Sequence, residues 1–178
     1  MVGKYIIAAA LFVAACAAPY SLAVDDRAAI STRITSFERA VVAGNSSEIL
    51  SVIPPRMITA IAAKAGLTEQ TLRGEMAKAT RDATRDADVI FFDIALDQAT
   101  FQTTASGRPY SLIPTQTVIQ ASGNRSKLQS NTSTLTLKDD GVWYLIRIDD
   151  ARQIALLREV YPDFEGVTLP IGTTKVID

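Results

Sequence analysis

Few side chains of this protein could carry acid–base or nucleophilic chemistry, because its 178 residues include no histidine. That absence removes Ser-His-Asp and Cys-His pairs, imidazole catalysis and histidine metal ligands. Catalysis would have to use carboxylates, tyrosine, lysine or arginine, a narrow set of groups at neutral pH. The acidic pairs Asp139–Asp140 and Asp149–Asp150 lack the alternating oxygen ligands of a calcium loop. We expect no metal site and no cofactor, and the composition favours a non-catalytic protein over an enzyme.

Asp93 is the carboxylate whose surroundings could make it a base, because it lies inside the apolar run Val89–Leu96. Alternation along this run predicts two faces, one formed by Ile90, Phe92, Ile94 and Leu96 and the other by Val89, Phe91, Asp93 and Ala95. An alternating strand needs an outward face, so we expect Asp93 to point to solvent or to pair with Arg147. The alternative is a buried Asp93 with a raised pKa, which would indicate a catalytic pocket.

A second set of candidates lies on and near the expected strand Val142–Ile148. Trp143 and Arg147 share one side of it, and a guanidinium supported by an aromatic ring can hold an anionic ligand. The competing interpretation, which the sequence favours, is a stacked surface pair with the aromatic residues in the core or at its rim. The residues carried forward as candidate ligand-binding groups are Trp143, Tyr144, Arg147 and Tyr110.

The elements that would position these residues centre on a hairpin from Thr132 to Ile148. Two β-runs flank Asp139-Asp140-Gly141, which suits a type I turn closed by a glycine with positive φ. On the return strand Val142, Tyr144, Ile146 and Ile148 share one side, and Trp143, Leu145 and Arg147 share the other. Both sides are largely apolar. The hairpin is therefore packed on both faces, or has one packed face and one concave face.

Hydrophobic periodicity places helices in the first half of the chain and strands in the second. The first helix carries an apolar stripe of Ile30, Ile34, Phe37 and Val41. A β-bulge is expected near Asp97–Gln98. The expected helices are 25–43, 45–53, 56–65 and 68–83, followed by strands 89–96, 100–103, 110–121, 127–137 and 142–148, a helix 151–160 and a tail after Pro162 along the body.

Helices followed by antiparallel strands indicate an α+β fold, in which the N-terminal helices cover the concave face of a curved, cone-shaped antiparallel sheet. This layout, with a closing strand Gly141-Val142-Trp143-Tyr144-Leu145-Ile146-Arg147, resembles the nuclear transport factor 2-like (cystatin-like fold) superfamily over residues 26–160. The sequence departs from the enzymes of that superfamily in lacking histidine, in its extra helical residues 54–83 and in its tail.

The resemblance implies two different roles. In the ketosteroid isomerase branch, a strand carboxylate inside the cone acts as a base and a tyrosine holds an oxyanion. On this chain those roles would fall to Asp93 with Tyr144 or Tyr110. Many other members of this kind are small exported bacterial proteins with no assigned chemistry, and this chain is similar to them.

The N-terminus has the pattern of an export signal. Lys4 precedes the apolar run Ile6–Ala18, and small residues at Ser21 and Ala23 suit cleavage before Val24. The expected organisation is a signal peptide, residues 1–23, and a single α+β domain, residues 24–178, with a C-terminal helix and tail.

Two other interpretations of the N-terminus stay open. Val13-Ala14-Ala15-Cys16 resembles a bacterial lipobox, in which the signal ends before Cys16 and that cysteine is acylated. The apolar stretch after Cys16 is unlike the usual polar tether, which ranks this interpretation second. A membrane anchor from Tyr5 to Val24 ranks third, because Pro19 and the cleavage pattern argue against it.

Composition limits the partners. The formal charge is −1 with both signs interspersed, so nothing predicts nucleic-acid binding. We expect a location outside the cytoplasm, either periplasmic or secreted, or alternatively on the outer membrane as a lipoprotein. The expected function is non-catalytic binding of a small hydrophobic or amphipathic molecule in the cone, or of a protein partner, including a homodimer through the sheet. The alternatives are an isomerase- or dehydratase-like enzyme using Asp93, and an envelope assembly or immunity-type interaction protein.

Overall fold

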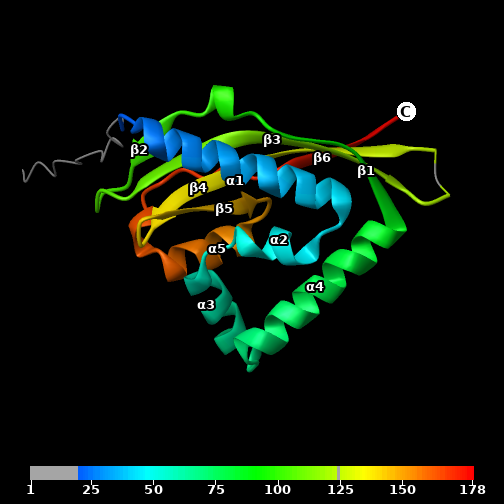
Figure 1. Cartoon of the computed structure of the whole chain (residues 1–178), viewed down its shortest axis with the longest axis horizontal. Coiled ribbons are helices and arrows are strands. Elements are labelled where there is room, and N and C mark those ends of the chain that lie inside the picture. Colours follow the sequence, from blue (N-terminus) through cyan, green and yellow to red (C-terminus); the bar gives the residue numbers. More distant parts are fainter. Residues whose placement is uncertain (1–19, 124) are drawn as a thin grey trace, which may run out of the picture.

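The computed structural model describes residues 20–123 and 125–178. This part of the chain is a mixed α+β structure of five α-helices and a six-stranded antiparallel sheet that is curled into a half-barrel (Figure 1). The fold class expected from the sequence is confirmed. The helices are α1 (Val24–Ala43), α2 (Ser46–Ser51), α3 (Pro55–Ala65), α4 (Glu69–Asp86) and α5 (Ala151–Val160). The strands are β1 (Ala87–Ile94), β2 (Phe101–Thr103), β3 (Pro109–Ala121), β4 (Lys127–Asp139), β5 (Val142–Ile148) and β6 (Thr173–Ile177).

The two long strands, β3 and β4, form the centre of the sheet. β1 and β2 pair with successive stretches of the outer edge of β3. β5 and β6 pair in the same way with the outer edge of β4. The sheet is therefore four strands wide, and two short strands make up each of its edges.

One face of the sheet is covered by α1, as its apolar stripe predicted. Ile30 and Ile34 are buried in one cluster with Ile113 of β3 and with Trp143 and Leu145 of β5. Gly44 ends this helix with a left-handed φ of 64°, which a residue with a side chain rarely adopts. We call this side of the sheet the α1 face.

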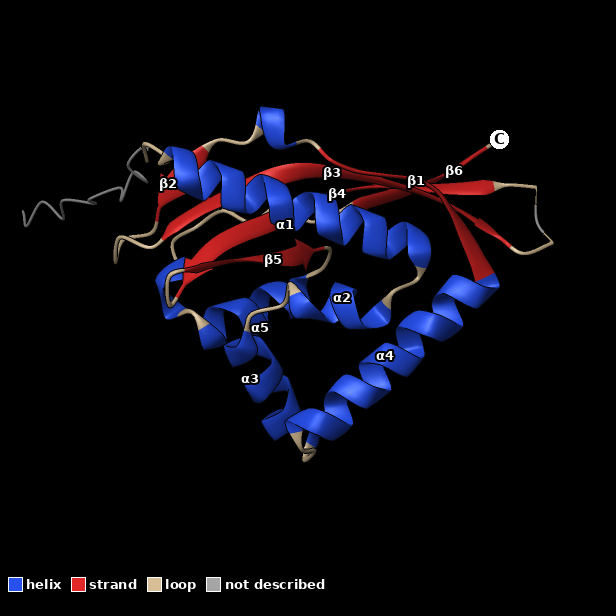
Figure 2. Cartoon of the chain, viewed as in Figure 1, coloured by secondary structure: helices blue, strands red, loops and turns tan. Residues whose placement is uncertain are grey.

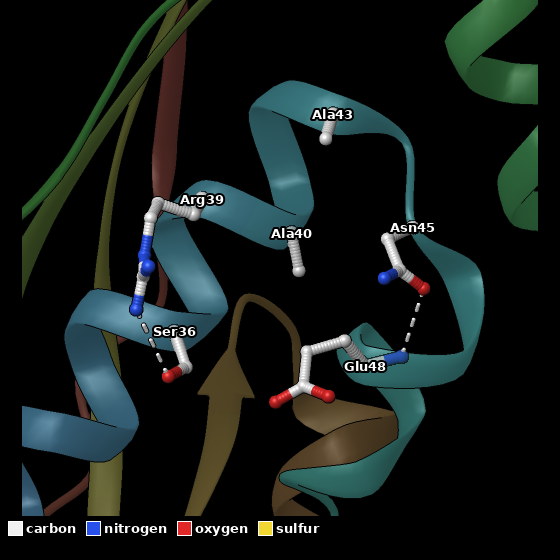
Figure 3. A pocket seen from close by; sticks show the side chains of 6 residues that line it. All are labelled: Ser36, Arg39, Ala40, Ala43, Asn45 and Glu48. Carbon is white, nitrogen blue, oxygen red and sulfur yellow. Dashed lines mark hydrogen bonds between the residues drawn. The ribbon is translucent and has the colours of Figure 1, made fainter.

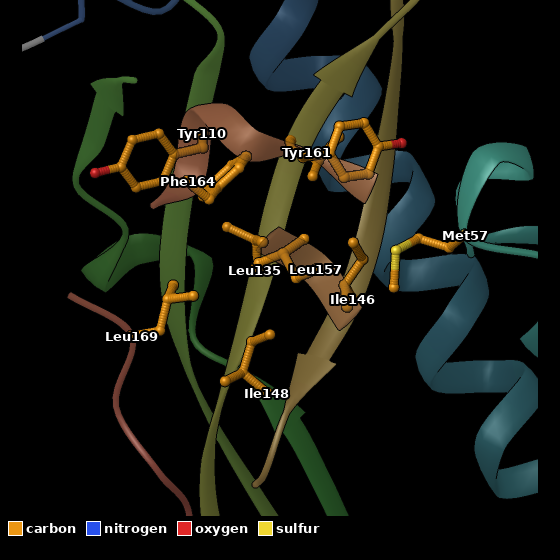
Figure 4. Packing of buried hydrophobic residues seen from close by; sticks show 10 residues of the cluster. Met57, Tyr110, Leu135, Ile146, Ile148, Leu157, Tyr161, Phe164 and Leu169 are labelled. Atoms are coloured by element: carbon orange, nitrogen blue, oxygen red, sulfur yellow. The ribbon is translucent and has the colours of Figure 1, made fainter. Parts of the chain in front are cut away.

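The opposite face is covered by α5 and by the short 3-10 helix η2 (Pro162–Phe164). Leu157, Tyr161 and Phe164 are fully buried against Leu135 and other residues of β4 and β5 (Figure 4). Both faces of β5 are thus packed, which is one of the two arrangements that the apolar sides of its sequence left open.

α3 and α4 form an arm that extends away from the sheet and meet at its apex (Figure 2). A small cluster of Ile58, Ala62 and Leu72 holds the two helices together. Met57, at the start of α3, also reaches the core beneath α5. The arm therefore has its own apolar contacts and is joined to the main core near the start of α3.

Two local predictions were wrong, and one strand was not predicted. The β4–β5 loop has positive φ at both Asp140 (47°) and Gly141 (79°), so it is a type I′ turn and not the type I turn expected; this type matches the twist of the two strands. The bulge in β1 lies between Val89 and Phe91, whereas a 3-10 helix, η1 (Leu96–Gln98), follows the strand at the position where a bulge was expected. The tail lies along the body as expected, and part of it forms β6, a strand that the sequence analysis did not predict.

The bulge changes the faces predicted for β1. Val89 pairs with Ile119 and Phe92 pairs with Thr117, and positions 117 and 119 of β3 lie on the same face. Val89 and Phe92 therefore share the α1 face, contrary to simple alternation. Ile90, the extra residue, is exposed.

Candidate functional site

Trp143 is a core residue whose polar atom is already used. Its side chain is 3% exposed on the α1 face, and the Phe101 ring contacts it edge-on at 6.0 Å between centroids. The indole Nε1 donates a hydrogen bond to Asp26 Oδ1 at 2.9 Å. The residue therefore has a structural role that fully accounts for its burial and its hydrogen bond.

Arg147 lies on the same face as Trp143 but is exposed. Its Nε donates to Asp149 Oδ1 at 2.8 Å. Four strand positions separate Arg147 from Trp143, about 13 Å along the backbone. The expected stack of a guanidinium on the indole is not formed.

Tyr110 and Tyr144 occupy the opposite face, on either side of Leu137 in the strand register. The Tyr110 hydroxyl donates to Gln102 Oε1 at 2.7 Å, and burial raises the pKa of this phenol. Tyr144 is half-buried with the Arg33 guanidinium 5.4 Å from its ring centroid. The four residues proposed to bind a ligand are consequently divided between two faces of the sheet.

Asp93 is exposed and pairs in register with Gln116 of β3. Since Phe92 lies on the α1 face, Asp93 faces the other way. Gln116, the partner of Asp93, is six residues from Tyr110 along β3, so the backbones of Gln116 and Tyr110 lie about 20 Å apart. The structure brings Asp93 together with neither tyrosine, and Arg147 pairs with Asp149 rather than with Asp93. The enzyme hypothesis needs a buried Asp93 beside a tyrosine, and this pair is not formed.

The α1 face carries a set of hydroxyl groups that the sequence analysis did not single out. Thr115 and Thr134 bond to each other across the strands, Oγ1 to Oγ1, at 2.8 Å. Four further buried hydroxyls have no hydrogen-bond partner in the described part of the chain, those of Ser111, Thr117, Thr132 and Thr136. We call these four the hydroxyl set. A period-two run of threonine was visible in the sequence, but such a run is equally typical of an exposed strand face.

A shallow groove of about 300 Å³ lies between the C-terminal half of α1 and the start of α2 (Figure 3). Its lining is formed by Ser36, Arg39, Ala40, Ala43, Asn45 and Glu48. Several of the polar groups are already engaged: Asn45 Oδ1 accepts from the Glu48 N–H at 3.2 Å, and Arg39 Nε donates to the Thr35 carbonyl at 3.2 Å. The groove lacks the apolar lining that holds small hydrophobic molecules.

An ionic network joins α3, the loop before β3, the end of β4 and the segment after α5. Asp139, whose side chain is 6% exposed, accepts from Arg108 Nη1 at 3.0 Å and from the Tyr161 hydroxyl at 2.8 Å. Arg56 Nη1 lies 3.6 Å from the same carboxylate. The guanidinium carbons of Arg56 and Arg108 lie 5.0 and 4.9 Å from the Tyr161 ring centroid. Burial and the bond to Asp139 both raise the pKa of the Tyr161 hydroxyl, so it stays a donor.

The same arginine binds a second carboxylate. Arg108 Nε donates to Asp163 Oδ2 at 2.8 Å, and the hydroxyls of Thr104 and Ser106 donate to that oxygen at 3.0 Å. Burial alone would raise the pKa of Asp163, but these hydrogen bonds outweigh it and the pKa lies below its usual value. Since each charged group has close partners, the network fits a structural role at this end of the sheet.

The far end of the sheet, where β1, β3, β4 and β6 run side by side, exposes apolar side chains. Val89, Ile119, Leu128 and Val176 follow one another in register on the α1 face, and we call them the apolar row. Leu128 is 40% exposed and Val176 is 65% exposed. Within the described residues no strand pairs with the outer edge of β6. The apolar row thus ends at an exposed side chain on a free strand edge, and this is the candidate site.

Comparison with known proteins found no matching family model, no matching curated protein and no matching solved structure. Within the described residues, no group of three or more acidic or cysteine side chains is placed to hold a metal ion. None of the helices described combines the length and the apolar character needed to cross a bilayer.

Proposed function

We propose that this protein is an exported, non-catalytic binding domain that accepts an extended segment of a partner protein along the free edge of β6. The observation that carries the proposal is the apolar row, which ends at the exposed Val176. An edge strand presents unpaired N–H and C=O groups, and strand addition is a common way to recognise an extended peptide.

The register favours a fifth strand at this edge. Val176 continues the apolar row that Leu128 and Ile119 form on the two inner strands. A strand added beside β6 would place a side chain next to Val176 on the same face. An apolar residue there would shield Val176 from water, which would stabilise the complex by about 25 cal/mol for each Å² of apolar surface buried.

The charge on β6 indicates the chemistry of the added strand. Lys175, the central residue of β6, lies on the face opposite Val176 and is exposed. Two copies of β6 paired antiparallel about their centre would place Lys175 against Lys175, which is unfavourable. An acidic residue of a different protein would be favoured there instead. The partner segment is therefore one in which apolar and acidic residues alternate, and a homodimer through β6 is disfavoured.

The opposite edge of the sheet is less suited to a partner. The bulge at Ile90 interrupts β1. The Ile94 N–H donates to Glu38 Oε1 at 3.0 Å, so this edge amide already has an acceptor. Bulges and covered amides are the usual protection of an edge strand against further pairing.

The proposal includes a place in the nuclear transport factor 2-like superfamily and an export signal at the N-terminus. The order of helices and strands and the hairpin carrying Gly141–Arg147 support the first. Lys4 with the apolar run after it supports the second, and a periplasmic or secreted location would follow.

A titration with a defined peptide tests the proposal. The probe is a capped heptapeptide of alternating valine and glutamate, added to isotope-labelled protein and followed by backbone amide NMR. We expect the largest shifts at Thr173–Ile177 of β6 and at the paired residues of β4. Shifts centred on the groove at Asn45, or no shifts at millimolar peptide, would contradict strand addition at β6.

A further inference from the structure

The four residues before α1 are part of the folded domain. The Tyr20 N–H donates to the Phe101 carbonyl of β2 at 3.1 Å. The Tyr20 and Leu22 side chains are half-buried and pack against the cluster that contains Phe101 and Trp143. A segment that a peptidase removes has no need of such contacts.

Ala23 also takes part in the first turn of α1. Its carbonyl accepts the Arg27 N–H at 3.0 Å, while its own side chain is exposed. Cleavage between Ala23 and Val24 would remove this acceptor. It would also place a new ammonium group at the positive end of the helix dipole, which is unfavourable.

Cleavage after Ala23 would further uncover the core. Phe101 and Trp143 are 8% and 3% exposed in the structure that includes Tyr20 and Leu22. Loss of those two side chains would expose apolar surface of the α1 face to water. The Phe101 carbonyl would also lose its hydrogen bond from Tyr20.

We infer that export processing, which rests on the export proposed above, leaves residues 20–23 on the mature protein, so that the chain is cut on the N-terminal side of Tyr20. This inference ranks cleavage before Cys16 above cleavage before Val24, which reverses the ranking made from the sequence. The site before Cys16 meets the requirement and the site before Val24 does not; Cys16 itself lies outside the described residues.

Cleavage before Cys16 follows a defined chemistry. The Cys16 sulfur forms a thioether with the terminal glyceryl carbon of a membrane glycerophospholipid, whose phosphate headgroup leaves with the thiol proton. Water then hydrolyses the Ala15–Cys16 peptide bond. The retained residues from Cys16 to Ala23 would link the lipid to the start of α1.

The intact mass of the processed protein tests the inference. The full chain is expressed with its own N-terminus in a bacterial host and isolated from the cell envelope. We expect a shortened chain that begins at or before Tyr20, whereas an uncut chain beginning at Met1 would contradict the export processing itself. A lipid-bearing mass beginning at Cys16 would identify the lipidation route, and an unmodified start between residues 16 and 20 would support the inference through another peptidase. A chain beginning at Val24 would overturn it.

The variant Ala23→Tyr gives a second readout. Ala23 is exposed, so a larger side chain fits there without disturbing the core. A large residue at the last position of a signal peptide blocks cleavage after it. If the inference holds, the variant is processed like the wild type and its mass differs by the substitution alone. Accumulation of the uncut precursor would overturn it.

Discussion

The indole Nε1 of Trp143 donates to Asp26 Oδ1 at 2.9 Å, and Lys138 Nζ donates to the same oxygen at 2.8 Å. One carboxylate in the first turn of α1 thus binds two residues of the β4–β5 hairpin. This contact fixes α1 on the sheet and aligns its apolar stripe with the core. We call this contact the joint, because it connects α1 to the β4–β5 hairpin.

The first prediction concerns this joint. Asp26→Ala should lower the free energy of unfolding by about 1–3 kcal/mol, because it leaves the Trp143 N–H buried without an acceptor. Asp25→Ala is the matched control, since Asp25 lies in the same helical turn but is exposed. Urea unfolding followed by tryptophan fluorescence measures both variants. If both variants lose the same free energy of unfolding, Asp26 stabilises the protein through the helix dipole and not through its bonds to the hairpin.

The second prediction concerns acid stability. Hydrogen bonds from Lys138 and then Trp143 lower the pKa of Asp26, and those from Arg108, Ser106 and Thr104 lower that of Asp163 against the opposing effect of burial. In the unfolded chain an Asp has a pKa of about 3.9. The unfolded state therefore binds more protons in acid, and stability should be complete above about pH 5 and fall as the pH drops through the lower folded values.

Urea unfolding from pH 2 to pH 7 measures this dependence. Asp163→Asn should be less stable than the wild type at neutral pH and should lose less stability on acidification. An identical loss of stability between pH 5 and pH 2 in both proteins would exclude Asp163 as a contributor.

The third prediction uses the hydroxyl set. The Thr136 hydroxyl is buried without a partner in the described chain, whereas that of Thr134 bonds to Thr115. Thr136→Val should therefore be neutral or stabilising, by up to about 1 kcal/mol, because it removes a buried unpaired polar group and keeps the shape. Thr134→Val should be destabilising, because it removes the buried hydrogen bond between the Thr115 and Thr134 hydroxyls. Thermal unfolding of the two variants compares them directly, and a loss of stability in Thr136→Val would indicate a bond that this hydroxyl makes in solution.

The fourth prediction concerns the β1 edge. Glu38→Ala removes the acceptor of the Ile94 N–H, and we expect this amide to exchange with solvent deuterium at least tenfold faster. Glu48→Ala, at an exposed position of α2, is the control and should leave Ile94 unchanged. Unaltered exchange at Ile94 in Glu38→Ala would show that the edge is protected in another way.

Much of the fold could be predicted because its signals are local. Gly44 and Gly66 end α1 and α3 with left-handed φ values of 64° and 65°, and Asp150 caps α5 together with Gln153. The change of period near Asp88 correctly separated helices from strands. These features depend on residues close in sequence, so the chain alone reveals them.

The features that were missed depend on distant partners. Arg108 meets Asp163 across 55 residues, and neither residue has a local pattern that indicates the pairing. The bulge at Ile90 shifts the register of β1 against β3, which alternation within one strand cannot show. β6 is recognisable as a strand only once β4 is in place to pair with it. The candidate site at the end of the apolar row therefore had no signal in the sequence.

The most direct test of the proposed function reverses the charge at the centre of β6. Two capped heptapeptides, valine alternating with glutamate or with lysine, are titrated into the wild type, into Lys175→Glu and into the control Arg27→Glu, whose exposed side chain lies on α1. The account predicts that the wild type and the control bind the glutamate peptide more tightly, and that Lys175→Glu binds the lysine peptide more tightly. The same peptide preference in all three proteins would contradict recognition of a partner strand at β6.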